Sequence, residues 1–338
     1  MINVALLGLG RIGKEHFYSY KQLSGVQLVK IVDKNLAENN YFINGKQIEF
    51  SSDIDQIIND KSIDAIDICL PTFLHADIAI KAANAGKHVF CEKPMALDLD
   101  QCDEMIHAAR VNNIKLMIGQ LLRFVPEYAA AKKIVSNGKI GTLLSFTGRR
   151  LVSYPQYSES GWLQNEKLSG GAAFDLMIHD IDAINWFFDG KNPVSITASG
   201  LSSKSGSLDH IFASFEFENG SKGFIDGGWI IPQTFPFSME FQIVGTDGFL
   251  KYHSHGLSSR ERHQNSENTS LMLYHDDNSI APKIQQKDSI TAELDYFYQS
   301  ILNNTTNQII TPEDAKRSVE WTLKVKKAAL TGEKLILR

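Results

Sequence analysis

Residues 2–13 read Ile2-Asn3-Val4-Ala5-Leu6-Leu7-Gly8-Leu9-Gly10-Arg11-Ile12-Gly13, an apolar run that meets three glycines within six positions. The apolar part is typical of a strand that is buried on both faces. The residues that follow, up to residue 25, predict a turn and then a helix. A buried strand that passes through a glycine turn into a helix is the opening unit of a parallel α/β sheet.

The spacing of these glycines predicts a binding site for the pyrophosphate of a dinucleotide. Gly8 permits a tight turn, Gly10 leaves room for the pyrophosphate beside the backbone, and Gly13 lets helix and strand pack closely. The N–H groups and the dipole at the helix N-terminus favour an anion there. Asp33 ends the next strand-like run, 20 residues beyond Gly13, where a carboxylate binds ribose hydroxyls. Asp33 favours NAD because it repels a 2′-phosphate, whereas Lys34 could accommodate that phosphate and leaves NADP open.

Strand-like and helix-like segments alternate through the first third of the chain. The strand-like runs lie at residues 26–33, 47–52, 63–70, 88–91 and 115–119, and helical spacing occurs at 54–58, 75–86 and 97–113. Strands separated by helices of this size predict a doubly wound parallel sheet with helices on both faces. We therefore expect an NAD(P)-binding Rossmann domain over residues 1–122.

The pattern changes after residue 122. Apolar residues alternate with period two at 195–199, 211–218, 221–229, 238–244 and 248–252, and helical spacing occurs at 126–137, 172–188, 290–302 and 312–330. This combination predicts an α+β domain with a large open, mainly antiparallel sheet over residues 123–338. Residues 254–288 are polar and weakly patterned, and they predict a long loop.

Composition excludes several classes of protein. The 338 residues carry 34 Lys and Arg against 39 Asp and Glu, a net charge of -5, which gives no reason to expect nucleic acid or an anionic membrane as a partner. No signal peptide and no apolar run of the roughly 18–20 residues that span a bilayer is evident. The cysteines Cys69, Cys91 and Cys102 form no Cys-x-x-Cys pair, so we expect reduced thiols and a cytoplasmic protein. The polar loop with His253, His255 and His263 lacks other ligand types at metal spacing, so no metal is expected.

A second motif, Glu92-Lys93-Pro94, directly follows the strand that ends at Cys91. In open α/β sheets, ligands bind outside the carboxyl ends of the strands. The segment 70–72, Leu-Pro-Thr, lies at the same edge one strand earlier. The position predicts that Lys93 projects where nicotinamide and substrate meet, although a lysine after a strand is also a common solvated surface charge.

A third motif runs from Gly170 to Asp182 (GGAAFDLMIHDID). Asp175 and His179 are four apart, so they share one face of a helix, and Asp182 lies near that face. A histidine is the usual general base, and a carboxylate one turn away can orient it. The alternative is an aspartate that stabilises the helix N-terminus beside a hydrogen-bonded core histidine.

Together the three motifs resemble the Gfo/Idh/MocA oxidoreductase family, which includes glucose–fructose oxidoreductase and inositol 2-dehydrogenase. The resemblance extends over essentially the whole chain through the segments 72–75 (TFLH), 86–94 (GKHVFCEKP) and 140–141 (IG). It implies a Rossmann domain followed by an α/β domain whose open sheet often forms subunit contacts, and hence a homodimer or homotetramer.

The resemblance also implies functional residues, position by position. The catalytic residues are Lys93, Asp175 and His179, and Arg123 approaches the substrate together with Asp175 and His179. The segment 154–162, with Tyr157 and Trp162, is aromatic and polar and is either a wall on which a sugar stacks or an ordinary surface loop. The residues expected to bind cofactor are Gly8, Gly10, Arg11, Ile12, Gly13, Asp33, Lys34, Pro71, Thr72, His75, Glu92 and Lys93.

The expected activity is oxidation of a secondary alcohol of a sugar, polyol or cyclitol with NAD or NADP, as in myo-inositol 2-dehydrogenase. In this hypothesis His179 removes the hydroxyl proton, Lys93 hydrogen-bonds the same oxygen, and Asp175 orients substrate and histidine. One alternative is an NAD-dependent, redox-assisted glycosidase of the same fold. Another is a non-catalytic regulator that senses dinucleotide and sugar, which the presence of all three residues argues against.

Overall fold

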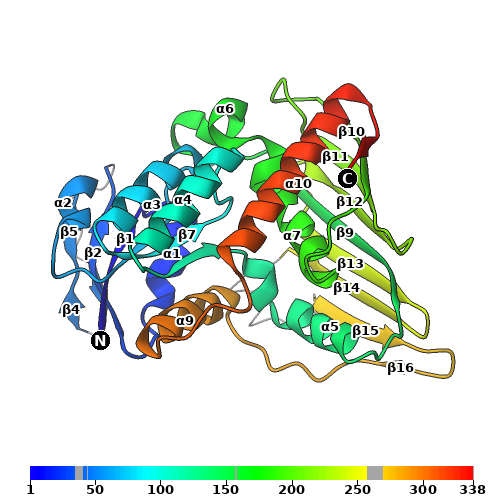
Figure 1. Ribbon diagram of the computed structural model, residues 1–338, viewed down its shortest axis with the longest axis horizontal. Helices are drawn as coiled ribbons and strands as arrows, with labels where there is room; N and C mark the ends of the chain where they lie inside the picture. The colour runs from blue at the N-terminus through cyan, green and yellow to red at the C-terminus, as the bar shows by residue number, and fades with distance from the viewer. Residues whose placement is uncertain (35–40, 44, 157, 257–268, 338) are drawn as a thin grey trace. The chain divides into compact units, whose positions relative to one another are not determined.

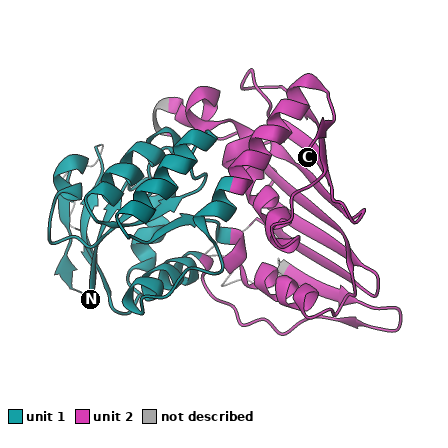
Figure 2. Ribbon diagram, viewed as in Figure 1, with its two compact units in different colours: residues 1–121, 290–316 teal, residues 122–289, 317–338 magenta. Residues whose placement is uncertain are grey.

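The computed structural model describes residues 1–34, 41–43, 45–156, 158–256 and 269–337. The chain divides into two compact units (Figure 2). The first comprises residues 1–121 and 290–316, and the second comprises residues 122–289 and 317–338. The sequence-based division at residue 122 assigned residues 290–316 to the second domain, whereas in the structure they pack with the first unit.

The first unit is built on a parallel sheet of six strands in the order β5-β2-β1-β6-β7-β8. Its strands are β1 (Ile2–Leu7), β2 (Val26–Val32), β5 (Glu49–Ser51), β6 (Ala65–Ile68), β7 (His88–Glu92) and β8 (Leu116–Gly119). All five pairings are parallel. The strand order reverses between β1 and β6, and in such sheets ligands bind at this reversal, beyond the carboxyl ends of the strands. The predicted doubly wound Rossmann fold is confirmed.

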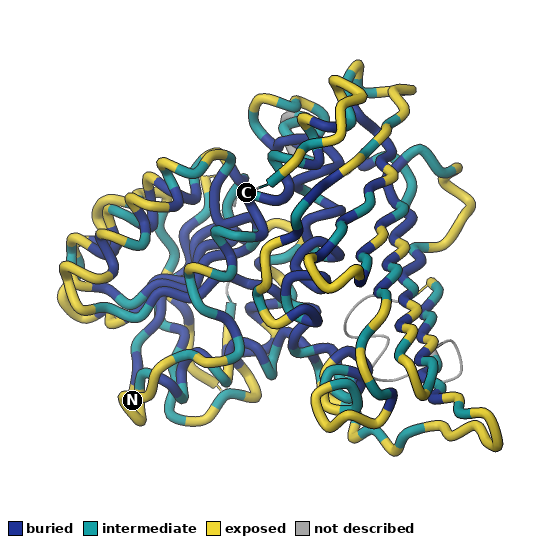
Figure 3. The backbone as a smooth tube through the Cα atoms, turned by 45° about the vertical axis from the view of Figure 1, so that its right-hand side comes forward, coloured by how far each residue is buried: buried dark blue, intermediate teal, exposed yellow. Residues whose placement is uncertain are grey.

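Helices cover both faces of this sheet (Figure 1). They are α1 (Arg11–Ser19), α2 (Ile54–Ile58), α3 (His75–Asn84), α4 (Leu99–Val111) and α9 (Ser289–Leu302), with a short hairpin formed by β3 (Phe42–Ile43) and β4 (Lys46–Gln47). The added helix α9 packs beside α1, where Thr291 Oγ1 donates to Ser19 Oγ at 3.0 Å. The central strands are buried along their length (Figure 3).

The second unit is built on a nine-stranded sheet in the order β16-β15-β14-β13-β9-β12-β11-β10-β17. Every pairing is antiparallel except that of β9 with β12, so the mainly antiparallel sheet that the sequence predicts is confirmed. Its strands are β9 (Leu143–Ser153), β10 (Ser195–Leu201), β11 (His210–Glu216), β12 (Lys222–Ile231), β13 (Ser238–Gly245), β14 (Phe249–His255), β15 (Thr269–Tyr274), β16 (Ser279–Ile280) and β17 (Leu335–Ile336).

Helices pack on one face of this sheet through aromatic side chains. The ring of Phe187 lies 5.1 Å from that of Phe146, and the ring of Tyr128 lies 4.7 Å from that of Phe241. Through these contacts, α7 (Ile178–Phe187) and α5 (Pro126–Ser136) pack on the sheet. The part of α10 (Pro312–Thr331) beyond residue 316 packs on the same face. Along these strands, buried residues alternate with residues that are partly or fully exposed (Figure 3). The sheet is therefore open on one side.

The long loop predicted for residues 254–288 is wrong in part, because β15 and β16 lie within it and extend the sheet edge. The sequence pattern did not indicate these strands, because the segment is mostly polar and β15 is only six residues long. Among the described residues, none of the helices combines the length and the apolar character that crossing a membrane requires.

Candidate functional site

The glycine turn after β1 has the geometry that a bound pyrophosphate needs. Gly8 has φ +91, and a Cβ there would lie 2.6 Å from the carbonyl oxygen of Cys69. A Cβ at Gly13 would lie 2.0 Å from the carbonyl oxygen of Gly8, so helix and turn touch. A Cβ at Gly10, the N-cap of α1, would meet nothing within 4 Å. The turn thus leaves open space above the helix N-terminus, which fits the dinucleotide phosphates.

Asp33 lies beside this turn. Its Oδ2 accepts a hydrogen bond from the backbone N–H of Leu9 at 2.8 Å, which holds the carboxylate next to the glycines. The neighbouring Lys34 is exposed. This placement fits a carboxylate that binds ribose hydroxyls at the end of the second strand.

The loop after β6 is tied to the loop after β7 by His75. The imidazole is buried, with Nδ1 2.8 Å from the carbonyl oxygen of Pro94 and Nε2 2.8 Å from that of Leu70. Burial lowers the pKa of His75, and the two carbonyl acceptors oppose this shift. Both ring nitrogens face backbone carbonyl oxygens, so His75 joins the two loops. Pro71, partly exposed, and Thr72, which begins the turn Thr72–Leu74, lie on the first of these loops.

Glu92 and Lys93 stand at the carboxyl end of β7. Glu92 is 8% exposed, and its Oε2 accepts a hydrogen bond from the backbone N–H of Lys93 at 3.1 Å. Lys93 is partly exposed and the Lys93–Pro94 peptide is cis. The lysine therefore lies at the edge where open α/β sheets bind ligands, and its peptide N–H is held by the carboxylate of Glu92.

In the second unit, the segment with Asp175 and His179 is a helix that begins with a π turn, Ala173–Met177, and continues as α7. The sequence predicted a regular helix here, and π turns of this kind occur often at functional sites. Gly170 precedes the helix with φ +78, and a Cβ there would overlap the ring of Phe174. From residue 171 to residue 185, every residue is buried except Asp175 and His179, which are partly exposed.

The other acidic residues of α7 are neutralised inside the unit. Asp180 Oδ2 accepts from Arg150 Nε at 2.7 Å, and Asp182 Oδ1 accepts from Arg123 Nη2 at 2.7 Å. Asp182, which helical spacing places near the face of His179, is buried in an ion pair with Arg123. Arg123, expected to approach the substrate, is 4% exposed, and its Nε donates to Asp182 Oδ2 at 3.0 Å.

The aromatic segment 154–162 is only partly described. Tyr157 lies outside the described residues, and Trp162 is partly exposed in the turn Glu159–Gln164. The structure brings Tyr154 against Trp229, with ring centroids 5.9 Å apart. Of the three histidines considered for a metal, His263 lies outside the described residues; the rings of the other two, on β14, lie 5.5 Å apart.

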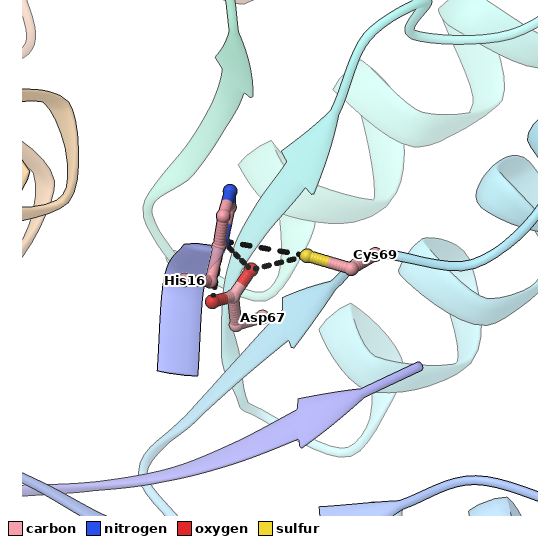
Figure 4. Close-up of side chains that lie close together, drawn as sticks. All are labelled: His16, Asp67 and Cys69. Carbon is pink, nitrogen blue, oxygen red and sulfur yellow. Dashed lines mark hydrogen bonds and ion pairs between the residues drawn. The ribbon is translucent and has the colours of Figure 1, made fainter. Parts of the chain in front are cut away.

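A group of buried ionisable side chains lies beneath the glycine turn and was not predicted from the sequence. It is formed by His16, Asp67 and Cys69 (Figure 4). These residues lie on α1, on β6 and directly after β6. The signal in the sequence is the carboxylate of Asp67 between Ile66 and Ile68 in a central strand, since such a charge is buried only with a partner.

Comparison with known proteins agrees with this architecture. Residues 2–120 match the family model described as "Oxidoreductase family, NAD-binding Rossmann fold", and residues 128–251 match the "GFO/IDH/MocA C-terminal domain". The chain is 32% identical over 256 residues to the uncharacterized oxidoreductase YrbE of Bacillus subtilis, covering 73% of this chain and 72% of that one. It is 27% identical over 329 residues to scyllo-inositol 2-dehydrogenase (NAD(+)) of the same organism, covering 94% and 91%.

Among solved structures, scyllo-inositol dehydrogenase from Lactobacillus casei with bound NAD(H) and scyllo-inositol has a TM-score of 0.76 at 25% identity, with 99% of each chain covered. The parallel sheet of the first unit and its strand order fit the NAD-binding Rossmann fold that the family model describes. The chain belongs to the GFO/IDH/MocA family of oxidoreductases and has an NAD-binding Rossmann domain.

Proposed function

We propose that the protein is an NAD-dependent dehydrogenase that oxidises a secondary alcohol of a sugar, polyol or cyclitol, with inositols as the first class to test. The names of relatives that align over nearly the whole chain support this substrate class. The open space above Gly10 and the position of Asp33 support NAD as the cofactor.

The observation that carries the proposal is the polar pair on α7. Arg150 and Arg123 bind two of the three aspartates of this segment in the core, and Asp175 and His179 alone of residues 171–185 are partly exposed. A buried helix that exposes one carboxylate and one imidazole presents a base and a group that can orient it. In the proposed reaction, His179 accepts the proton of the substrate hydroxyl, and Asp175 hydrogen-bonds substrate and imidazole.

Lys93 has a separate role in the proposed reaction. Its ammonium donates a hydrogen bond to the alcohol oxygen, where negative charge develops as the proton leaves. A bound NAD supplies the acceptor for the hydride of the carbinol carbon. The ammonium of Lys93 must be in position before the charge develops. The hydrogen bond from the Lys93 peptide to Glu92 would help to hold it there.

The test is a panel of inositols, linear polyols and aldoses, each incubated with the protein and either NAD or NADP. We expect one substrate class to reduce the cofactor. We expect NADH to form from NAD faster than NADPH forms from NADP. Release of a sugar from glycosides without net NADH would identify a redox-assisted glycosidase. Binding of NAD and a sugar without turnover would identify a regulator, and either result would overturn the dehydrogenase.

We also propose that two copies pair through the open face of the nine-stranded sheet, as a homodimer or as part of a homotetramer. Phe212 and Phe224 lie on neighbouring strands of this face and are 43% and 38% exposed. They line a shallow hollow together with Thr147 and Thr197. A cytoplasmic location is part of the proposal and is supported by the three cysteines, which are buried free thiols.

A further inference from the structure

A buried imidazole in the first unit lies between two carboxylates. His16 Nδ1 is 2.9 Å from Asp67 Oδ2, and His16 Nε2 is 3.2 Å from Glu92 Oε1. His16 and Asp67 have no exposed surface, and Glu92 is 8% exposed. The view in Figure 4 shows the ring of His16 above the carboxylate of Asp67, with the thiol of Cys69 to one side. The three acidic and basic groups come from α1, β6 and β7, so tertiary packing alone brings them together.

The contacts fit a ring that is protonated on both nitrogens. A carboxylate accepts hydrogen bonds, and an imidazole that contacts one carboxylate with each nitrogen can donate to both as an imidazolium. Burial alone disfavours the charged ring, but the carboxylate of Asp67, together with Cys69, raises the pKa of His16 well above its usual value. The cation compensates two carboxylates that would otherwise be buried without a counter-charge.

The far side of this network is fixed by two tyrosines. Tyr20 Oη donates to Asp67 Oδ2 at 2.7 Å and lies 2.6 Å from Tyr298 Oη on α9. Asp67 therefore binds His16 and Tyr20, and Tyr20 in turn contacts Tyr298 on α9, so the carboxylate holds one orientation. The segment 290–316, which packs with this unit, thus contributes to the network.

On its other side, the network is connected to Lys93 through Glu92. The Oε1 atom of Glu92, which contacts His16, lies over Gly119, where a Cβ would be 3.0 Å away. The Oε2 atom accepts the backbone N–H of Lys93 at 3.1 Å. One carboxylate thus joins the imidazolium on one side to the lysine peptide on the other.

We propose that His16 is a positioning residue for Lys93, acting through Glu92. The imidazolium fixes the carboxylate of Glu92 in one orientation, and that carboxylate fixes the peptide from which the lysine side chain projects. Without the cation, Oε1 of Glu92 loses its partner, the carboxylate turns away from its site, and the peptide of Lys93 loses its acceptor. This inference rests on the role that the proposed function gives to Lys93.

A metal ion is the competing explanation for the same cluster. One atom each from His16, Asp67 and Cys69 lies within 4.8 Å of the other two, close enough for shared coordination. However, a metal takes the thiolate form of cysteine, and burial raises the pKa of the Cys69 thiol. Each separation also fits a hydrogen bond, with Cys69 Sγ 3.3 Å from His16 Nδ1. The protonated network accounts for the geometry without an ion.

The experiment is a double-mutant cycle with His16→Gln and Lys93→Gln, using NAD and the alcohol that the panel selects. His107→Gln, on the exposed side of α4, is the matched control. We expect His16→Gln to lower kcat by about 10–100-fold, because small misplacements near the reacting atoms have effects of this size. The Kd for NAD stays within about threefold of wild type, since the proposed effect passes through Glu92 to the peptide of Lys93 and leaves the backbone of the glycine turn unchanged. In the Lys93→Gln background, where rates are measured over long incubations, adding His16→Gln changes kcat by less than about twofold.

Hydrogen exchange on the cofactor-free protein gives a readout that does not depend on turnover. We expect the amide of Lys93 to exchange faster in His16→Gln than in wild type, and the amides of β1 and β2 to exchange at unchanged rates. Asp67→Asn, which keeps the shape and most hydrogen bonds, should move both readouts in the same direction. It replaces His16→Gln in the cycle if the latter does not fold.

The outcomes separate this inference from the proposed function. Wild-type kcat in Lys93→Gln would overturn the proposed role of the lysine and the inference with it. Loss of activity in Lys93→Gln together with wild-type kcat and exchange in His16→Gln would overturn the inference alone. An equal loss from His16→Gln in both backgrounds would indicate a general structural effect, and stoichiometric zinc that Cys69→Ala removes would indicate a metal site; both contradict it.

Discussion

Arg123 and Asp182 form a bidentate ion pair inside the second unit, with Nε 3.0 Å from Oδ2 and Nη2 2.7 Å from Oδ1. Ser318 Oγ on α10 donates to the same Asp182 Oδ1 at 3.0 Å. The pair therefore joins the turn Leu121–Phe124, α7 and α10, and both of its partners are almost fully buried.

The first prediction follows from this pair. Asp182→Asn leaves the guanidinium of Arg123 buried without its counter-charge, which costs about 3–5 kcal/mol of unfolding free energy. Urea unfolding measures this loss. Arg149→Gln, at an ion pair half exposed on its arginine side, is the control and should cost less than about 1 kcal/mol. Unchanged stability of Asp182→Asn together with a strongly raised KM would instead place Arg123 at the substrate.

The second prediction concerns His179. Replacing it with alanine removes the proposed base, so kcat should fall by about 10²–10⁴-fold while the Kd for NAD stays unchanged. The residual rate should rise with pH, because hydroxide takes over the role of the imidazole. Steady-state kinetics and NAD titration across pH provide the measurement, with His255→Ala on β14 as the control. Near-normal turnover of His179→Ala at neutral pH would rule out the base assignment.

The third prediction compares two glycines of the same turn. Gly10→Ala introduces a methyl group into open space, so the thermal midpoint should stay unchanged while NAD binding weakens by at least about tenfold, as the methyl group occupies the pyrophosphate position. Gly13→Ala would place its Cβ 2.0 Å from the carbonyl oxygen of Gly8, so this variant should also lose stability. Thermal unfolding and NAD titration of both variants test the contrast. Unchanged NAD affinity of Gly10→Ala would show that the space above Gly10 is not a phosphate site.

The fourth prediction concerns cofactor choice. Asp33→Ser keeps an acceptor for the Leu9 N–H but removes the charge that repels a 2′-phosphate. The ratio of kcat/KM for NAD to that for NADP should fall by at least about tenfold, which corresponds to ~1.4 kcal/mol. Lys34→Ala tests the opposite influence, since the loss of a cation should weaken NADP alone. An unchanged ratio in both variants would mean that other residues select the cofactor.

Local sequence patterns predicted most of the fold. The apolar run ending in the glycine turn, and the change of period after residue 122, correspond to the two sheets that the structure contains. The helix at residues 290–302 was also predicted, but periodicity describes only which face is buried and not which sheet covers it. The contact of Tyr298 with Tyr20, which shows that this helix packs with the first unit, joins residues too distant for any local pattern.

The same limit applies to the candidate site. Helical spacing predicted that Asp175 and His179 share one face of a helix. In the structure, both are partly exposed while their neighbours in the helix are buried. Spacing could not predict that Arg123 would bind Asp182, because nothing local to either residue indicates the partner. Asp67 is the exception. A carboxylate inside an apolar strand indicates that a buried partner exists, although the sequence does not identify that partner.

The last prediction tests the open face of the nine-stranded sheet. Phe224→Glu places a charge among side chains that the proposed dimer would bury, so the homo-oligomer should dissociate at micromolar concentration. The reason is that an apolar contact would be replaced by a charge without a partner. Light scattering after size-exclusion chromatography measures the mass, and Phe235→Glu, an exposed phenylalanine in the turn after β12, is the matched control. A wild-type chain that is monomeric at these concentrations, or a Phe224→Glu variant that keeps the wild-type mass, would show that this face does not hold two copies together.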